Sequence, residues 1–146
     1  MIVSKHSSNM FDSKAQTFTI PVNTEGVMGA GLALYAKLKY PTLLHAYKEA
    51  CRRGIFKQDG FFVFDVNAKK KILCIPTKIR WRDNSKLEWI DESLYKFAIN
   101  YSKHDITSLA VPGLGCGRGN LEWENVFPII EKHLGPIDIP VELYLP

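Results

Sequence analysis

The chain has 146 residues, of which 46% are hydrophobic and 23% charged, and its formal net charge is +4. This length and composition indicate one soluble globular domain over residues 1–146. No apolar run approaches the ~20 residues of a membrane span, and the first residues lack a signal-peptide core. We therefore expect a cytoplasmic protein with no membrane partner. The three cysteines are odd in number and form no CxxC pair, which argues against a disulfide framework and a zinc site.

The first half of the chain alternates strand-like and helix-like segments. The predicted elements are a strand at 17–22 (TFTIPV), helices at 31–40 and 42–53, and strands at 61–66 (FFVFDV) and 71–75 (KILCI). Pro41 separates the two helices, and Gly54 is a typical residue for the end of the second.

The second half continues this alternation. The predicted elements are a helix at 87–101, a strand at 107–111, a helix with the apolar face Trp123, Val126, Phe127 and Ile130, and a strand at 138–145. Ser85 and Glu88 match a capping box for the first helix, and Asn120 is a candidate cap for the second. Strands that alternate with helices predict an α/β sandwich with a largely parallel or mixed sheet.

Two predicted strands run directly into glycine-rich loops. The loops are contained in VNTEGVMGAGLAL (22–34) and PGLGCGRGN (112–120). Glycine allows positive φ and close approach of a ligand, and successive backbone N–H groups before a helix bind anions. Neither loop matches GxxxxGK[ST] or GxGxxG. Because ligands of such sheets bind at the carboxyl ends of the strands, the pair of loops predicts a site for a diphosphate.

Lys78 follows the strand at 71–75 and is expected to project from the carboxyl edge of the sheet. Arg80 and Arg82 lie close in sequence, and neighbouring cations lower the pKa of an amine and make it more nucleophilic. The alternative interpretation is an ordinary solvated lysine at a strand end.

The stretch KIRWRDNSK (78–86) interleaves basic and apolar side chains. This pattern suits a nucleic-acid substrate, with Trp81 stacked on a base while Arg80, Arg82 and Lys86 contact phosphates. The alternative is that Trp81 covers the adjoining helix.

Taken together, the motifs VNT-x-GVMG-x-G, PTK and G-C-G-x-x-x-L-x-W-E resemble the macrodomain family, whose members bind ADP-ribose. The similarity covers nearly the whole chain and is greatest to the branch that contains the DarG antitoxin macrodomain and the terminal ADP-ribose glycohydrolase. It implies a three-layer α/β/α fold with a central mixed, largely parallel sheet. It also implies a glycohydrolase that removes ADP-ribose from thymidine in single-stranded DNA, with no cofactor and no metal.

The resemblance assigns roles to single residues. Lys78 corresponds to a catalytic lysine that acts on the anomeric carbon of the distal ribose or on its ring-opened aldehyde. Asn23 would bind the hydroxyls of that ribose, or else be a turn residue that bonds its own backbone. Asn9, with Met10 beside it, would read the adenine amino group, or else cap a loop. Tyr144 would pack near adenine, or else be a buried strand residue.

The two loops supply the remaining expected contacts with ADP-ribose. The first would contribute Thr24, Gly26, Val27, Met28, Gly29, Ala30, Gly31 and Leu32, and the second Pro112, Leu114, Gly115, Cys116, Gly117, Arg118 and Gly119. Cys116 is expected to act through its backbone, with a nucleophilic thiol as the alternative. Arg118 would contact a phosphate or point to solvent. The terminal ADP-ribose glycohydrolase has an Asp where this chain has Gly119, so that catalytic acid is absent here.

Three functions therefore remain open at the level of sequence. The first is release of ADP-ribose from single-stranded DNA. The second is hydrolysis of another linkage, such as a protein ester or ADP-ribose 1''-phosphate, and the missing acid argues against the ester. The third is a non-catalytic ADP-ribose reader. In each case we expect a monomer.

Overall fold

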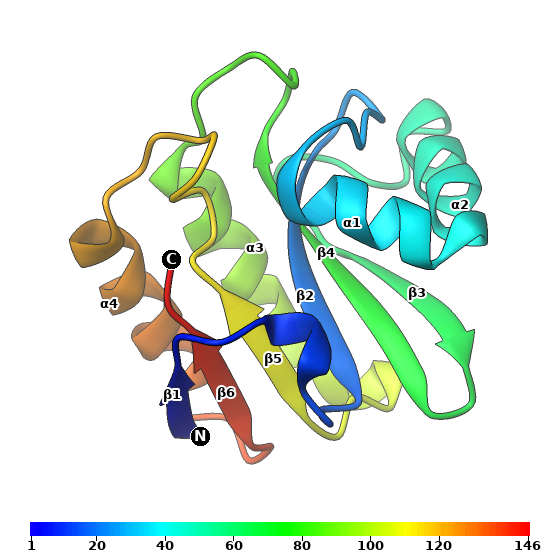
Figure 1. Ribbon diagram of the computed structural model, residues 1–146. Coiled ribbons are helices and arrows are strands. Elements are labelled where there is room, and N and C mark those ends of the chain that lie inside the picture. Colours follow the sequence, from blue (N-terminus) through cyan, green and yellow to red (C-terminus); the bar gives the residue numbers. More distant parts are fainter.

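A six-stranded sheet with the strand order β1-β6-β5-β2-β4-β3 forms the centre of the computed structural model, which describes residues 1–146 (Figure 1). The strands are β1 (Ile2–His6), β2 (Thr17–Asn23), β3 (Phe62–Asn67), β4 (Lys70–Lys78), β5 (Leu109–Pro112) and β6 (Val141–Tyr144). The helices are α1 (Gly31–Lys39), α2 (Pro41–Arg52), α3 (Leu87–Asn100) and α4 (Trp123–Leu134), with short 3-10 turns η1 (Met10–Asp12) and η2 (Tyr101–His104). No helix is both long enough and apolar enough to cross a membrane.

All neighbouring strands are parallel except the edge pair β3 and β4. This confirms the expected α/β fold with a mixed, largely parallel sheet. The carboxyl ends of β5, β2 and β4 therefore lie side by side at one edge. In the register of β2 with β4, Asn23 is the partner of Lys78.

Two apolar clusters cover the two faces of the sheet. β4 shows why: Ile72 and Cys74 belong to the cluster under α1 and α2, whereas Leu73 and Ile75 belong to the cluster under α3 and α4. Successive strand residues point to opposite faces, so one continuous apolar run supplies both layers. Figure 1 shows α1 and α2 on the face opposite to α3. The result is the predicted three-layer arrangement.

Both predicted helix caps are wrong. α3 begins at Leu87, and Lys86 occupies the N-cap position without a side-chain hydrogen bond. Ser85 bonds to Thr77 instead. α4 begins after Glu122, while Asn120 has φ 62° and its side chain donates to Asn84 Oδ1 at 2.7 Å. In each case a contact with another segment replaces the local cap.

The predicted elements are present with shifted ends, and three short elements, β1, η1 and η2, have no counterpart among them. The break before Pro41 and the helix end at Gly54, which has φ 70°, are confirmed. The strand expected at 138–145 is shorter, at Val141–Tyr144. The sequence pattern does not indicate β1, because this short strand alternates between half-buried and exposed residues and pairs only with β6.

Candidate functional site

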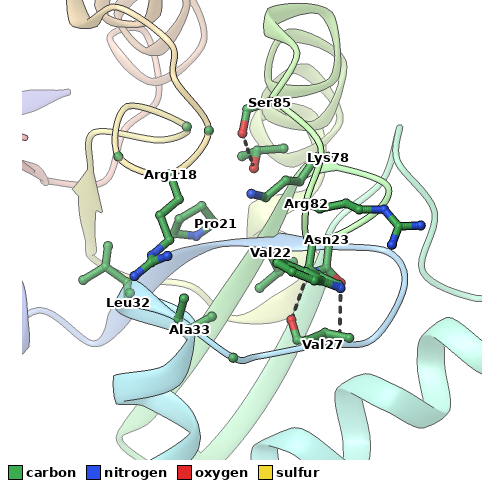
Figure 2. A pocket seen from close by; sticks show the side chains of 18 of the residues that line it. Pro21, Val22, Asn23, Val27, Leu32, Ala33, Lys78, Arg82, Ser85 and Arg118 are labelled. Carbon is green, nitrogen blue, oxygen red and sulfur yellow. Dashed lines mark hydrogen bonds between the residues drawn. The ribbon is translucent and has the colours of Figure 1, made fainter.

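The carboxyl ends of β5, β2 and β4 open into a cleft of about 760 Å³. This is within the range of small-molecule sites. The lining residues are Pro21, Val22, Asn23, Val27, Gly29, Ala30, Gly31, Leu32, Ala33, Thr77, Lys78, Trp81, Arg82, Ser85, Gly113, Gly115, Gly117, Arg118 and Gly119. Both glycine-rich loops and the end of β4 thus contribute to one site (Figure 2).

Asn23 holds the first loop in shape from the end of β2. Its Oδ1 accepts from the backbone N–H groups of Gly26 at 3.0 Å and Val27 at 3.1 Å, and its Nδ2 donates to the Val27 carbonyl at 2.8 Å (Figure 2). Only 5% of Asn23 is exposed. The side chain therefore performs the turn role that was the alternative to ribose binding, and one Nδ2 proton is left for a ligand.

Tyr47 of α2 supports Asn23 from below. Its hydroxyl, in a fully buried side chain, lies within hydrogen-bond reach of the Asn23 carbonyl and of Asn23 Oδ1, 2.9 Å away. Burial raises the pKa of Tyr47, so the phenol stays a neutral donor. Gly26 adopts φ 99°, a conformation that other residues rarely adopt, and completes the turn.

The second loop is shaped by packing against Ser85. A Cβ at Gly119 would lie 2.6 Å from the Gly115 carbonyl oxygen and 2.7 Å from Ser85 Cβ. A Cβ at Gly115 would lie 2.7 Å from Leu121 Cδ1, and this glycine has φ 74°. The carbonyl oxygen near Gly119 is backbone and cannot move cheaply, so glycine is required there. At Gly115 the positive φ favours glycine, because Leu121 Cδ1 is the end of a flexible side chain. Gly117, by contrast, faces open space.

The cleft is positively charged. Lys78, Arg82 and Arg118 line it, and no lining residue is acidic. In Figure 2 the Lys78 amine points toward the loop that carries Arg118, whereas the Arg82 guanidinium points the other way. Burial lowers the pKa of Lys78, Asp83 opposes this shift, and Arg118 adds to it. The site therefore combines a positively charged surface with an amine that loses its proton more readily than an ordinary lysine.

The basic segment after β4 is only partly in the cleft. Trp81 and Arg82 line it, and Trp81 is 56% exposed at its mouth. Arg80 and Lys86 are exposed outside the lining. Lys86 Nζ instead lies 5.0 Å from the centre of the Trp89 ring.

Thirteen of the residues that sequence assigned to the site line the cleft: Asn23, Val27, Gly29, Ala30, Gly31, Leu32, Lys78, Trp81, Arg82, Gly115, Gly117, Arg118 and Gly119. The others lie outside the lining: Asn9, Met10, Thr24, Gly26, Met28, Arg80, Lys86, Pro112, Leu114, Cys116 and Tyr144. Sequence reasoning missed Pro21, Val22, Ala33, Thr77, Ser85 and Gly113. Of these, Thr77 could have been found from the sequence, because it precedes Lys78 in the PTK motif.

Two of the outlying residues, Asn9 and Tyr144, have clear structural roles, and a third, Cys116, has a thiol that is a poor nucleophile. Asn9 Oδ1 accepts from Phe11 N at 2.9 Å and so caps η1. Tyr144 is 7% exposed, stacks on His6 and bonds to Glu142. Burial and the nearby Glu122 raise the pKa of the Cys116 thiol, which disfavours the nucleophilic thiolate.

Comparison with known proteins gives consistent relationships. The Macro domain family model matches residues 20–130. A DNA ADP-ribosyl glycohydrolase of Mycobacterium tuberculosis is 39% identical over 123 residues, covering 82% of this chain and 35% of the relative. Among solved structures, the macrodomain of Thermus aquaticus DarG has a TM-score of 0.93 at 32% identity, covering 100% of this chain and 99% of that chain.

Thermosipho africanus DarTG in complex with ADP-ribose has a TM-score of 0.89 at 37% identity, covering 94% of this chain and 40% of that chain. The chain thus spans well under half the length of the mycobacterial relative and of the Thermosipho protein. The family model nevertheless covers most of the residues that build the sheet and the cleft. The chain belongs to the macrodomain family.

Proposed function

We propose that this chain binds ADP-ribose in the cleft and hydrolyses its bond to a nucleobase, thymidine, in single-stranded DNA. The observation that carries the proposal is the position of Lys78. Its amine faces a glycine-lined cleft, in register with Asn23 and across from Arg118. The names of the mycobacterial relative and of the Thermosipho complex support the same ligand and substrate class.

The two loops would hold the diphosphate between them. The N-terminus of α1 adds a partial positive charge on one side, and Arg118 adds a full charge on the other. A Cβ at Gly31 or Gly117 would have no protein atom within 4 Å, so ligand atoms can approach the backbone there. The remaining Nδ2 proton of Asn23 would donate to a hydroxyl of the distal ribose.

Lys78 would act at the anomeric carbon of that ribose. In the overall reaction, the bond between this carbon and the base nitrogen breaks, the nitrogen takes a proton, and a hydroxyl from water ends on the carbon. Because the cleft is lined by no carboxylate, its own side chains offer only the lysine amine, whose pKa burial lowers, as a group that could give or accept a proton in the reaction. Trp81, at the mouth, would stack on an exposed base of the strand.

The decisive experiment compares wild type with Lys78→Ala and Lys78→Arg on an ADP-ribosylated single-stranded oligonucleotide. We expect at least a hundredfold slower release by both variants, while Lys78→Arg retains ADP-ribose binding because its positive charge remains. Lys103→Ala, an exposed lysine in η2 away from the cleft, is the matched control and should release at the wild-type rate.

Other outcomes separate the remaining functions. Calorimetric binding of ADP-ribose without release from any substrate would identify a reader. Release from a protein ester or from ADP-ribose 1''-phosphate, but not from DNA, would identify a hydrolase of another linkage. Absence of ADP-ribose binding would exclude all three.

We also propose that residues 1–146 act as one macrodomain, as a monomer and in the cytoplasm. All the lining residues of the cleft lie within the single sheet-and-helix unit of the chain, which supports one macrodomain. The three cysteines are free, as is usual in a reducing compartment. Light scattering after size-exclusion chromatography tests the monomer, because a dimer peak at micromolar concentration contradicts it.

A further inference from the structure

Two buried hydroxyl groups form part of the cleft wall beside the proposed catalytic lysine. Ser85 is 5% exposed and Thr77 2% exposed, and both line the cleft. Ser85 Oγ donates to Thr77 Oγ1 at 3.0 Å, the contact drawn at Ser85 in Figure 2. Thr77 immediately precedes Lys78 on β4. The pair therefore adjoins the reacting end of the site.

Ser85 also connects this strand end to the second glycine loop. Its backbone N–H donates to the Gly119 carbonyl at 2.9 Å, and the N–H of Lys86 donates to the Thr77 carbonyl at 2.9 Å. The Ser85 side chain fills the space that side chains at 115 and 119 would need. One short segment thus fixes the loop on one side and the end of β4 on the other.

The bond between the two hydroxyls has a consequence for the ligand. One shared bond uses a single proton, so the pair keeps a second proton, and in the arrangement in which Ser85 donates this is the proton of Thr77. Thr77 lines the cleft, where a ligand oxygen can accept that proton. A neutral donor beside Lys78 would bind a phosphate or ribose oxygen without adding charge.

We propose, on the basis of the function proposed above, that Ser85 is a positioning residue. It orients the Thr77 hydroxyl toward a ligand oxygen and holds the Lys78 end of β4 in fixed register with the second glycine loop. Its role in the reaction is thus exerted through Thr77 and not through direct contact with the reacting atoms.

The test is a double-mutant cycle with Ser85→Ala, Thr77→Val and the double variant. We expect each single change to lower kcat about tenfold while KM for the ADP-ribosylated oligonucleotide changes less than threefold. The double variant should be no slower than either single variant, because both remove the same donor. Thr77→Ser keeps the hydroxyl and should restore most of kcat.

Ser93→Ala is the matched control, since Ser93 is a fully buried serine of α3 that bonds only to the Gln58 carbonyl, away from the cleft. It should leave kcat unchanged. An unchanged kcat in Ser85→Ala would overturn the inference. So would a double variant whose loss is the product of the two single losses, or losses that merely follow the melting temperature.

The wild-type chain separates this inference from the proposed function. If wild type releases ADP-ribose and Ser85→Ala does so equally well, only the inference fails. If wild type binds ADP-ribose without turnover, the proposed function and this inference both fail, because the losses expected here are in kcat and not in affinity. If wild type does not bind ADP-ribose, both fail.

Discussion

The two glycine-rich loops of the cleft are held in shape by different contacts. The first is fixed by hydrogen bonds to the Asn23 side chain, and its Gly31 has no protein atom near a Cβ position. The second is fixed by backbone hydrogen bonds, such as Leu121 N to Gly115 O at 2.9 Å, and it is also packed closely against Ser85 at Gly115 and Gly119. Glycine in the first loop thus provides turn geometry and an open backbone, whereas most glycine in the second provides close packing. The two loops should therefore respond differently to mutation, although both are rich in glycine.

The largest loss of stability is expected from Asn23→Ala. It leaves the Gly26 and Val27 N–H groups without their acceptor, while the Tyr47 hydroxyl keeps the Asn23 carbonyl, and this should lower the free energy of unfolding by about 3 kcal/mol. Denaturant titration measures this. Asn67→Ala is the control, because Asn67 accepts from Lys69 N in an exposed turn and should cost much less. Equal losses in the two variants would mean that the first loop does not depend on its asparagine.

The next largest effect is a difference in stability between two glycine substitutions in the second loop. Gly119→Ala forces Ser85 and the Gly115 carbonyl to move, which should cost about 2 kcal/mol of stability by overpacking. Gly117→Ala meets no protein atom and should leave stability within about 0.5 kcal/mol, while it weakens ADP-ribose binding. Thermal melting with and without ADP-ribose separates the two. Similar melting temperatures would contradict the packing account of this loop.

Trp81→Ala should act outside both loops. Loss of one base stack should weaken binding of a single-stranded oligonucleotide by about 1 kcal/mol while the affinity for free ADP-ribose stays the same. Fluorescence anisotropy measures the first and calorimetry the second. Tyr95→Ala removes another exposed aromatic ring, on α3 outside the cleft, and should change neither value. A parallel loss of both affinities would place Trp81 in the ADP-ribose site itself.

The smallest expected effect is a displacement of the pH profile. If deprotonation of Lys78 activates it, kcat rises with pH through the lowered pKa of this amine. Arg118→Ala should move that rise to higher pH and Asp83→Asn to lower pH, because Arg118 lowers and Asp83 raises this pKa. Initial rates between about pH 6 and 11 provide the measurement, since the lowered pKa lies below the ordinary lysine value of 10.5.

The same pKa shift has a consequence for stability with a definite sign. The folded pKa of Lys78 lies below its ordinary 10.5, so the unfolded chain binds more protons between the two values. The contribution of this residue to stability should therefore increase as pH rises through that window. Lys78→Met should abolish this part of the pH dependence.

Local patterns sufficed to predict the parts of the site that one segment defines. The loops at 22–34 and 112–120 and the position of Lys78 after a buried strand follow from composition and from the ends of strands. Ser85 was misread as a helix cap, because its partners Thr77 and Gly119 meet it only in the folded chain. Asn23 was given mainly a ligand role, because nothing in the sequence shows that Tyr47 and the loop amides use most of its polar atoms.

The strand order has a consequence for how the protein is made. β2 lies between β4 and β5, and both of these strands follow it in the chain. During synthesis β2 must remain unpaired until residues 70–78 have emerged, and its other edge until residues 109–112 follow. Because parallel pairing over such separations is slow, the cleft can form only late in folding. A nascent chain that stops before β5 would leave one edge of β2, the strand that ends in Asn23, without a partner strand. Such an exposed edge can pair with other chains, so the unfinished protein would be prone to aggregate before its cleft has formed.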